Sequence, residues 1–156
     1  MAKKDTYVYE YPRPMVTVDA AVFARVEGKA RLLLIERKHE PFRGRWALPG
    51  GFVEMDEDLP DAAARELAEE TGLTDVSLEQ LRTFGKPGRD PRGRAITVVY
   101  FGIAGKDGQQ ARAADDAARV QWFDIDRLPE MAFDHDQISR YAIDKLRQLP
   151  ASTLPA

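Results

Sequence analysis

Cysteine is absent from this chain of 156 residues. Its absence excludes disulfide bonds, a thiolate nucleophile and any zinc site built on cysteine ligands. Long apolar runs are also missing, because no stretch approaches the roughly 20 residues that a membrane-spanning helix needs. The two lysines near the start are not followed by an apolar segment, so we expect no secretory leader. Together these absences predict a cytoplasmic protein with no membrane partner.

A strong excess of charge of one sign is missing too. Charged residues make up 31% of the chain, but the net charge is only -3. A domain that binds duplex nucleic acid usually carries a dominant basic face, so we expect no nucleic-acid partner. Hydrophobic residues make up 44% of the sequence, which is enough for the core of one compact domain.

Apolar and β-branched runs alternate with turn-forming residues along the chain, and they predict a series of strands. The predicted strands span residues 16–24, 31–37, 76–84, 95–103 and about 119–123. The turn at residues 27–29 makes a hairpin of the first two. A helix is predicted over residues 58–71, with Asp58 as its N-cap and Gly72 as its stop.

A second helix is predicted over residues 136–148, where Ile138, Tyr141, Ile143 and Leu146 follow helical spacing. This mixed order of elements predicts an α/β sandwich, with a mixed sheet between helices. We expect three parts: an N-terminal arm over residues 1–14, the domain itself over 15–150, and a flexible tail over 151–156.

Three acidic residues crowd one face of the first predicted helix. At about 100° per residue, Glu66, Glu69 and Glu70 fall within an arc of roughly 100°. Their mutual repulsion costs stability unless a cation lies over them or solvent surrounds them. Hard oxygen ligands favour Mg²⁺ or Mn²⁺, and Arg65 is spaced to pair with Glu69. A solvated helix rich in glutamate is the alternative.

The segment around this helix resembles the signature of the Nudix hydrolase family, G-x5-E-x7-R-E-U-x-E-E-x-G-U, in which U is an apolar residue. Every defined position of the pattern is matched, by Gly51, Glu57, Arg65, Glu66, Leu67, Glu69, Glu70, Gly72 and Leu73. The resemblance extends to the preceding hairpin and to the strands that follow. It implies the α/β/α sandwich of that family, with the signature forming a loop, a helix and a loop.

The resemblance also implies roles for these residues. Glu66, Glu69 and Glu70 are expected to bind the divalent cation, Mg²⁺ or in its place Mn²⁺, together with the main-chain carbonyl of Gly50. Glu57 is expected to assist catalysis through water or by orienting its neighbours, and Arg65 to hold the acidic side chains in place.

The expected reaction is attack of a metal-activated water on a phosphorus atom of a pyrophosphate. The residue that accepts the proton of that water varies within the family. Glu69 is the first candidate, followed by Asp115 or Asp116, for which a solvated turn is the alternative interpretation. Asp134 and His135 are further possibilities.

Arginines downstream of the signature bear on the substrate. Arg89, Arg92 and Arg94, with Arg82 and Lys86 nearby, lie in a predicted turn where guanidinium groups can clamp a diphosphate. A solvated basic turn is the alternative. This segment and the stretch RPMVTVDAAVF resemble the ADP-ribose pyrophosphatase branch of the family, which implies cleavage of ADP-ribose to AMP and ribose 5-phosphate.

Two other functions remain open on the sequence. One is hydrolysis of an oxidised nucleoside triphosphate. The other, of a different class, is a non-catalytic sensor that binds ADP-ribose to regulate transcription, although such sensors often carry a damaged signature and this one is intact. Relatives in this branch are often homodimers, so we expect a homodimer in which the tyrosines of the arm contact the partner or the substrate.

Overall fold

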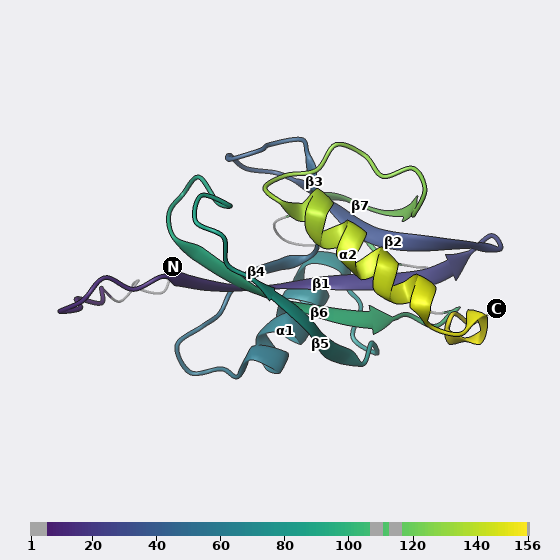
Figure 1. The fold of residues 1–156 in the computed structure, drawn as a ribbon, viewed down its shortest axis with the longest axis horizontal. Coiled ribbons are helices and arrows are strands. Elements are labelled where there is room, and N and C mark those ends of the chain that lie inside the picture. Colours follow the sequence, from purple (N-terminus) through teal and green to yellow (C-terminus); the bar gives the residue numbers. More distant parts are fainter. Residues whose placement is uncertain (1–5, 107–110, 113–116, 156) are drawn as a thin grey trace.

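A mixed sheet forms the middle layer of the molecule (Figure 1). The computed structural model describes residues 6–106, 111–112 and 117–155. Within these residues the sheet has seven strands in the order β3-β2-β1-β6-β5, with β4 paired to β1 and β7 paired to β2. The strands are β1 (Met15–Val26), β2 (Lys29–Arg37), β3 (Trp46–Ala47), β4 (Gly50–Phe52), β5 (Leu78–Phe84), β6 (Ala95–Ile103) and β7 (Ala117–Asp124).

The central strand β1 is parallel to β6 and antiparallel to β2 and β4. The predicted hairpin of β1 and β2 is confirmed, and it turns at Glu27 and Gly28, with φ of 51° and 76°. Positive φ at both positions fits the right-handed twist of paired strands. Glycine adopts this conformation without strain, whereas Glu27 does so against the usual preference.

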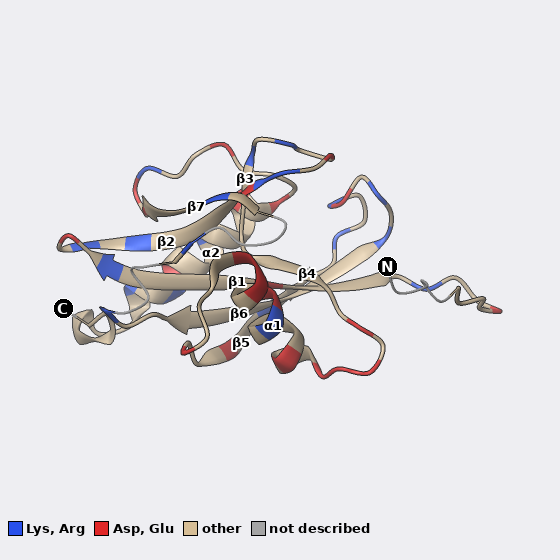
Figure 2. Ribbon diagram, turned by 180° about the vertical axis from the view of Figure 1, so that it is seen from behind, with Lys and Arg blue, Asp and Glu red and all other residues tan. Residues whose placement is uncertain are grey.

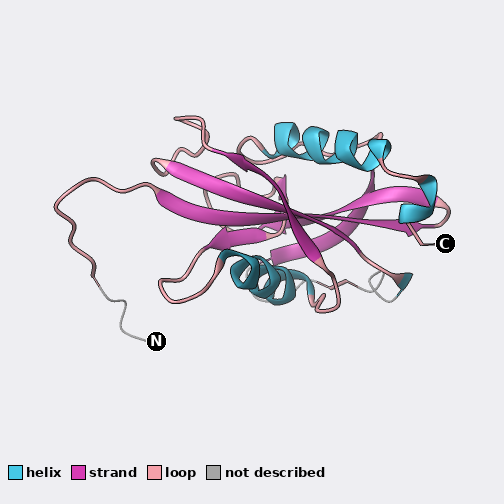
Figure 3. Cartoon of the chain, turned by 60° about the horizontal axis from the view of Figure 1, so that its bottom comes forward, coloured by secondary structure: helices cyan, strands magenta, loops and turns pink. Residues whose placement is uncertain are grey.

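Two helices cover opposite faces of the sheet, α1 (Leu59–Thr71) and α2 (His135–Gln148) (Figure 3). Alternate residues of β1 serve the two faces, as the pleat of a strand requires. Ala21 and Phe23 pack in the cluster that includes α2, while Val22 packs in the cluster that includes Leu67 of α1. The predicted α/β sandwich with a mixed sheet is therefore confirmed.

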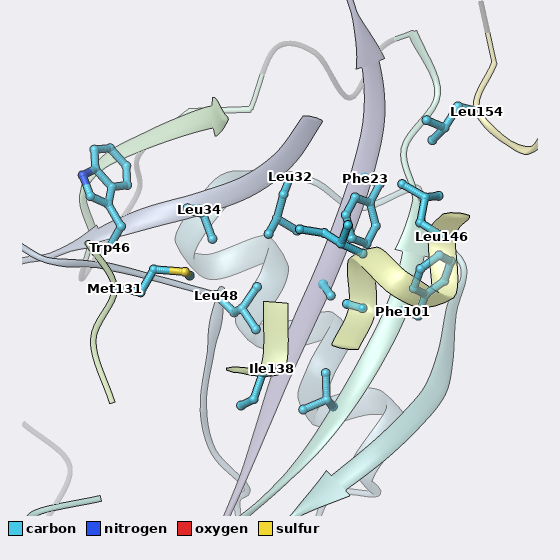
Figure 4. Packing of buried hydrophobic residues seen from close by; sticks show 14 residues of the cluster. Phe23, Leu32, Leu34, Trp46, Leu48, Phe101, Met131, Ile138, Leu146 and Leu154 are labelled. Atoms are coloured by element: carbon cyan, nitrogen blue, oxygen red, sulfur yellow. The ribbon is translucent and has the colours of Figure 1, made fainter. Parts of the chain in front are cut away.

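The largest cluster lies between α2 and the sheet (Figure 4). Phe23, Leu32 and Leu34 of the sheet meet Ile138 and Leu146 of α2 there. Of the residues with helical spacing, Tyr141 is 40% exposed, whereas the neighbouring Ala142 is fully buried. The Tyr141 ring lies edge-on to Phe84, with the Arg82 guanidinium over it.

The chain beyond α2 forms a short 3₁₀ helix, Ala151–Thr153, where we expected a flexible tail. Leu154, which is 8% exposed, packs in the same cluster as Leu146. Leu154 lies four residues after Pro150, and its packing holds the segment against the cluster. At the other end of the chain, residues 6–14 extend away from the sheet (Figure 3).

Helix α1 begins and ends where the sequence predicts. The Asp58 side chain accepts a hydrogen bond of 2.8 Å from the N–H of Leu59, and Gly72 ends the helix at φ 77°. Ala62, Ala63 and Leu67 are buried against the sheet, and Glu70 is buried on the same side of the helix. In the described part of the chain, no helix is long and apolar enough to cross a bilayer.

We predict that Leu67→Ala destabilises the protein by about 2–5 kcal/mol, because it leaves a cavity between α1 and the sheet. The free energy of unfolding measured by urea denaturation checks this value. Met55→Ala is the matched control, since Met55 is 67% exposed. A loss below about 1 kcal/mol for Leu67→Ala would show that α1 does not depend on this contact.

Candidate active site

A cavity of about 530 Å³ lies beside β4 and α1. Residues of β1, β2, β4, α1 and the loop between β5 and β6 line it. Figure 2 shows acidic positions on α1 and basic positions on that loop. The charged and polar residues of the lining are Thr17, Asp19, Arg37, Lys38, His39, Glu40, Glu54, Arg65, Glu66, Glu70, Arg89, Asp90, Arg92 and His135.

Three carboxylates of this lining form an acidic cluster: Asp19, Glu66 and Glu70. Asp19 and Glu70 are only 6% and 7% exposed. Burial, together with the neighbouring charges of Glu66 and Asp19, raises the pKa of Glu70 to about 9. Burial also raises the pKa of Glu66. Buried like charges of this kind are costly, and a cation among them would relieve the cost.

Arg65 holds several acidic side chains at once. Its guanidinium donates to both oxygens of Glu57, at 2.6 and 2.9 Å, and to Glu66 at 2.9 Å. The pairing with Glu69, which the sequence predicts, is present at 3.2 Å. The bonds from Arg65 lower the pKa of Glu57 to about 2, and they raise that of Arg65 itself. Arg65 thus fixes the carboxylate of Glu66 at the edge of the cavity.

Two glycines bring the backbone of β4 close to these acids. A Cβ on Gly51 would overlap the Glu66 carboxylate, and one on Gly50 would overlap Asp19 and the Val18 carbonyl. The Gly50 N–H donates to Glu70 over 3.3 Å. Glycine is therefore required at both positions by close approach, which the sequence pattern alone does not explain.

Glu69 stands apart from the other helix acids. Its side chain is 48% exposed and bound to Arg65, and it is not part of the cavity lining. Throughout the described ranges, no three acidic or histidine side chains converge into a preformed metal site. Glu66, Glu70 and the backbone of Gly50 nevertheless supply hard oxygen atoms in a buried, like-charged setting. That donor set fits Mg²⁺ or Mn²⁺.

Three arginines line the same cavity and form a basic cluster: Arg37, Arg89 and Arg92. Arg92 lies between the rings of Phe52 and Phe133, 5.1 Å from each centroid. It also pairs with the buried Asp90, and although burial raises the pKa of Asp90, the hydrogen bonds from Arg92 bring it below its usual value.

Arg37 was not singled out from the sequence, where it is only the last residue of a strand. Burial and the neighbouring Arg92 lower its pKa. Its guanidinium lies over the Phe133 ring and donates to the Pro41 carbonyl at 2.7 Å. No local motif marks this residue, because its neighbours come from distant parts of the chain.

The other predicted residues lie in different settings. Arg89 lines the cavity, but Asp134 binds its guanidinium at 2.7 and 2.9 Å. Arg94 donates to the Gly85 carbonyl and is not part of the lining. Asp115 and Asp116 lie outside the described residues. His135 is buried at the cavity, and burial lowers its pKa.

The fold and this site together define the class of the protein. Residues 15–146 match the NUDIX domain, so the chain belongs to the Nudix family. Its relatives support the same assignment at the level of activity, that of a Nudix hydrolase acting on phosphorus-containing acid anhydrides.

Three similar proteins show which members of the family this chain resembles. The chain is 42% identical to the ADP-ribose pyrophosphatase of Methanocaldococcus jannaschii over 137 residues. The aligned region covers 87% of this chain and 78% of that protein. It is 35% identical to the ADPR responsive transcriptional repressor NtrR of Acinetobacter baylyi, over 94% of this chain but only 62% of the repressor. The NUDIX domain of Shewanella oneidensis NrtR, solved in complex with ADP ribose, superimposes with a TM-score of 0.81 at 33% identity, covering 87% of this chain and 90% of that one.

We predict that Glu57→Gln lowers the free energy of unfolding at pH 7 by about 1–2 kcal/mol, because a carboxamide has no negative charge and only one oxygen to accept from Arg65. The pKa of Glu57 is lowered in the folded protein, so its contribution is complete above about 4.5 and is lost as the pH falls toward about 2. Urea denaturation at pH 7, 5 and 3 should therefore show the difference shrinking. The control is Glu79→Gln, since Glu79 is an exposed residue of β5. If the difference in unfolding free energy between wild type and Glu57→Gln grew toward acid pH, the ion pair of Glu57 with Arg65 would not be its cause.

Proposed function

We propose that this protein hydrolyses ADP-ribose to AMP and ribose 5-phosphate, with Mg²⁺ as its cofactor and Mn²⁺ as a substitute. The observation that carries the proposal is the pairing of an acidic cluster with a basic cluster in one cavity. Carboxylates suit a divalent cation, and guanidinium groups suit the oxygens of a diphosphate. The names of the relatives from M. jannaschii and S. oneidensis support the choice of ADP-ribose.

The cation would be held by Glu66, Glu70 and the Gly50 carbonyl, with Glu69 as the further carboxylate expected from the family resemblance. When bound, it would activate a water molecule and offset the charge of the diphosphate. Buried Glu70 and Arg65-bound Glu66 are already oriented before binding, so little side-chain motion is needed.

The remaining roles belong to the basic cluster and the proton acceptor. Arg37 and Arg92, which both lie over the Phe133 ring, would bind phosphate oxygens. A P–O bond forms to the water oxygen, the bridging P–O bond breaks, and one proton leaves the water. We assign that proton to Glu69 first, and to Asp115 or Asp116 next.

A second function has specific support. The repressor of A. baylyi is similar to this chain over 94% of the chain's length. The name of that repressor describes a response to ADPR. A sensor would need the cavity to bind ADP-ribose but would not need to hydrolyse it. The intact signature favours the enzyme, because binding alone does not require Glu69 and Glu70 in metal-ready register.

The arm supports the homodimer expected from the resemblance. Tyr7 and Tyr11 are 52% and 71% exposed, and Val8 is 90% exposed. Exposed apolar side chains in an extended segment are suited to contact a second copy of the chain.

We predict that Glu70→Gln reduces Mg²⁺-dependent hydrolysis of ADP-ribose by at least about 100-fold, more than the loss of an outer partner of a metal usually costs. The carboxamide fills the same space, so the fold should persist. The activity is measured with ADP-ribose, NADH, nucleoside triphosphates and diadenosine polyphosphates, with Glu79→Gln as the control. A wide preference for triphosphates would overturn ADP-ribose as substrate, and tight binding without turnover would favour the sensor.

We predict that Arg37→Gln raises the KM for ADP-ribose roughly tenfold, which corresponds to loss of about one charge-assisted hydrogen bond. Arg45→Gln is the matched control, since Arg45 is bonded through its carbonyl to the Arg37 N–H, but its side chain pairs with Glu130 and does not line the cavity. Equal KM values for the two variants would remove Arg37 from the substrate site.

A further inference from the structure

A buried polar network joins one member of the acidic cluster, Asp19, to residues on the other elements around it. It consists of His135 at the start of α2, Asp19 of β1 and Thr97 of β6. These residues are 5%, 6% and 0% exposed. A buried polar group without a hydrogen-bond partner costs stability, so the partners of these three side chains indicate their role.

The imidazole of His135 has a defined tautomer. The Leu48 N–H donates to Nδ1 over 3.0 Å, so Nδ1 is unprotonated and the ring proton is on Nε2. Nε2 points toward Asp19, with 3.7 Å between Nε2 and Oδ1. The other oxygen of Asp19 accepts a hydrogen bond from the Thr97 hydroxyl. Asp19 is therefore hydrogen-bonded from β6 and lies beside the imidazole of α2.

Asp19 in turn abuts the backbone of Gly50. The two are partners across β1 and β4, and even a methyl group on Gly50 would overlap Asp19. The residues before Gly50 are held as well: His135 binds Leu48, and Ala20 donates to the Pro49 carbonyl at 2.8 Å. The Gly50 N–H then donates to Glu70. A continuous path of contacts thus links α2 on one face of the sheet to Glu70 of α1 on the other.

We propose that His135 is a positioning residue: through Leu48 and Asp19 it sets where the Gly50 backbone lies relative to Glu70. This inference rests on the proposed function, because it concerns the carbonyl of Gly50 as part of a cation site. Its consequence is that the first residue of α2, far from the signature in sequence, controls the affinity of the site for a divalent cation.

The test measures Mn²⁺ binding to the full chain by calorimetry, without substrate. His135→Leu leaves the Leu48 N–H and Asp19 without their partner, and we expect the Mn²⁺ affinity to fall about tenfold or more, the usual cost of losing a supporting group around a metal. His135→Gln offers both an acceptor and a donor, so part of the affinity should return. Ser139→Ala is the matched control, because Ser139 is equally buried on α2 and its hydroxyl donates to the Met131 sulfur.

Thr97→Val is a second variant that tests whether the support of Asp19 affects Mn²⁺ binding. It keeps the shape of the side chain, removes the bond to Asp19 from the β6 side and leaves His135 untouched, so the Mn²⁺ affinity should fall in the same direction. It decides the matter if His135→Leu does not fold, as judged by its melting temperature. In the wild type, ¹⁵N NMR should show an unprotonated Nδ1 on His135.

Mn²⁺ affinities of folded His135→Leu and Thr97→Val within twofold of the wild type would overturn the inference, as would a proton on Nδ1. Wild-type protein that binds Mn²⁺ but leaves ADP-ribose intact contradicts the proposed substrate alone. In that case a loss of Mn²⁺ affinity in the variants still supports the role of His135.

Discussion

The placement of the acidic side chains depends on one guanidinium group, that of Arg65. It binds Glu57, Glu66 and Glu69 together and also donates to the Phe52 carbonyl at 3.1 Å, so it ties α1 to the loop that precedes it. Without such a cation, carboxylates this close would repel each other and turn to solvent. Lysine offers no planar fork and could not make the same set of bonds. Arg65 thus keeps Glu66 at the cavity while Glu70 is buried behind it.

The sheet gives this arrangement its rigidity. Asp19 and Gly50 face each other across β1 and β4, and β1 is covered on both faces by helices. Charged groups are therefore held by strands and a helix rather than by mobile loops, which favours precise placement of a cation and its water. The basic cluster is built differently: Arg37 at the end of β2 and Arg92 of the loop between β5 and β6 lie over the Phe133 ring, while Arg89 of that loop is bound to Asp134.

Much of the fold could be predicted from local pattern, because caps, turns and strands are encoded by neighbouring residues. Asp58, Gly72 and the Glu27–Gly28 turn are examples. Helical spacing predicts α2 but does not distinguish the centre of its buried face from the edge, where Tyr141 is 40% exposed. The signature could likewise predict the helix acids, since all lie within one segment. Arg37 and the contact of His135 with Leu48 could not be predicted, because they join residues far apart in sequence.

The central claim is that the acidic cluster and the Gly50 carbonyl together form a site for a divalent cation. Its most direct test is anomalous scattering from crystals soaked in Mn²⁺. A peak within coordination distance of Glu66, Glu70 and the Gly50 carbonyl, at about 2.0–2.6 Å as hard cations require, is the predicted result. A cavity without such a peak, or Mn²⁺ bound only elsewhere on the protein, would contradict it.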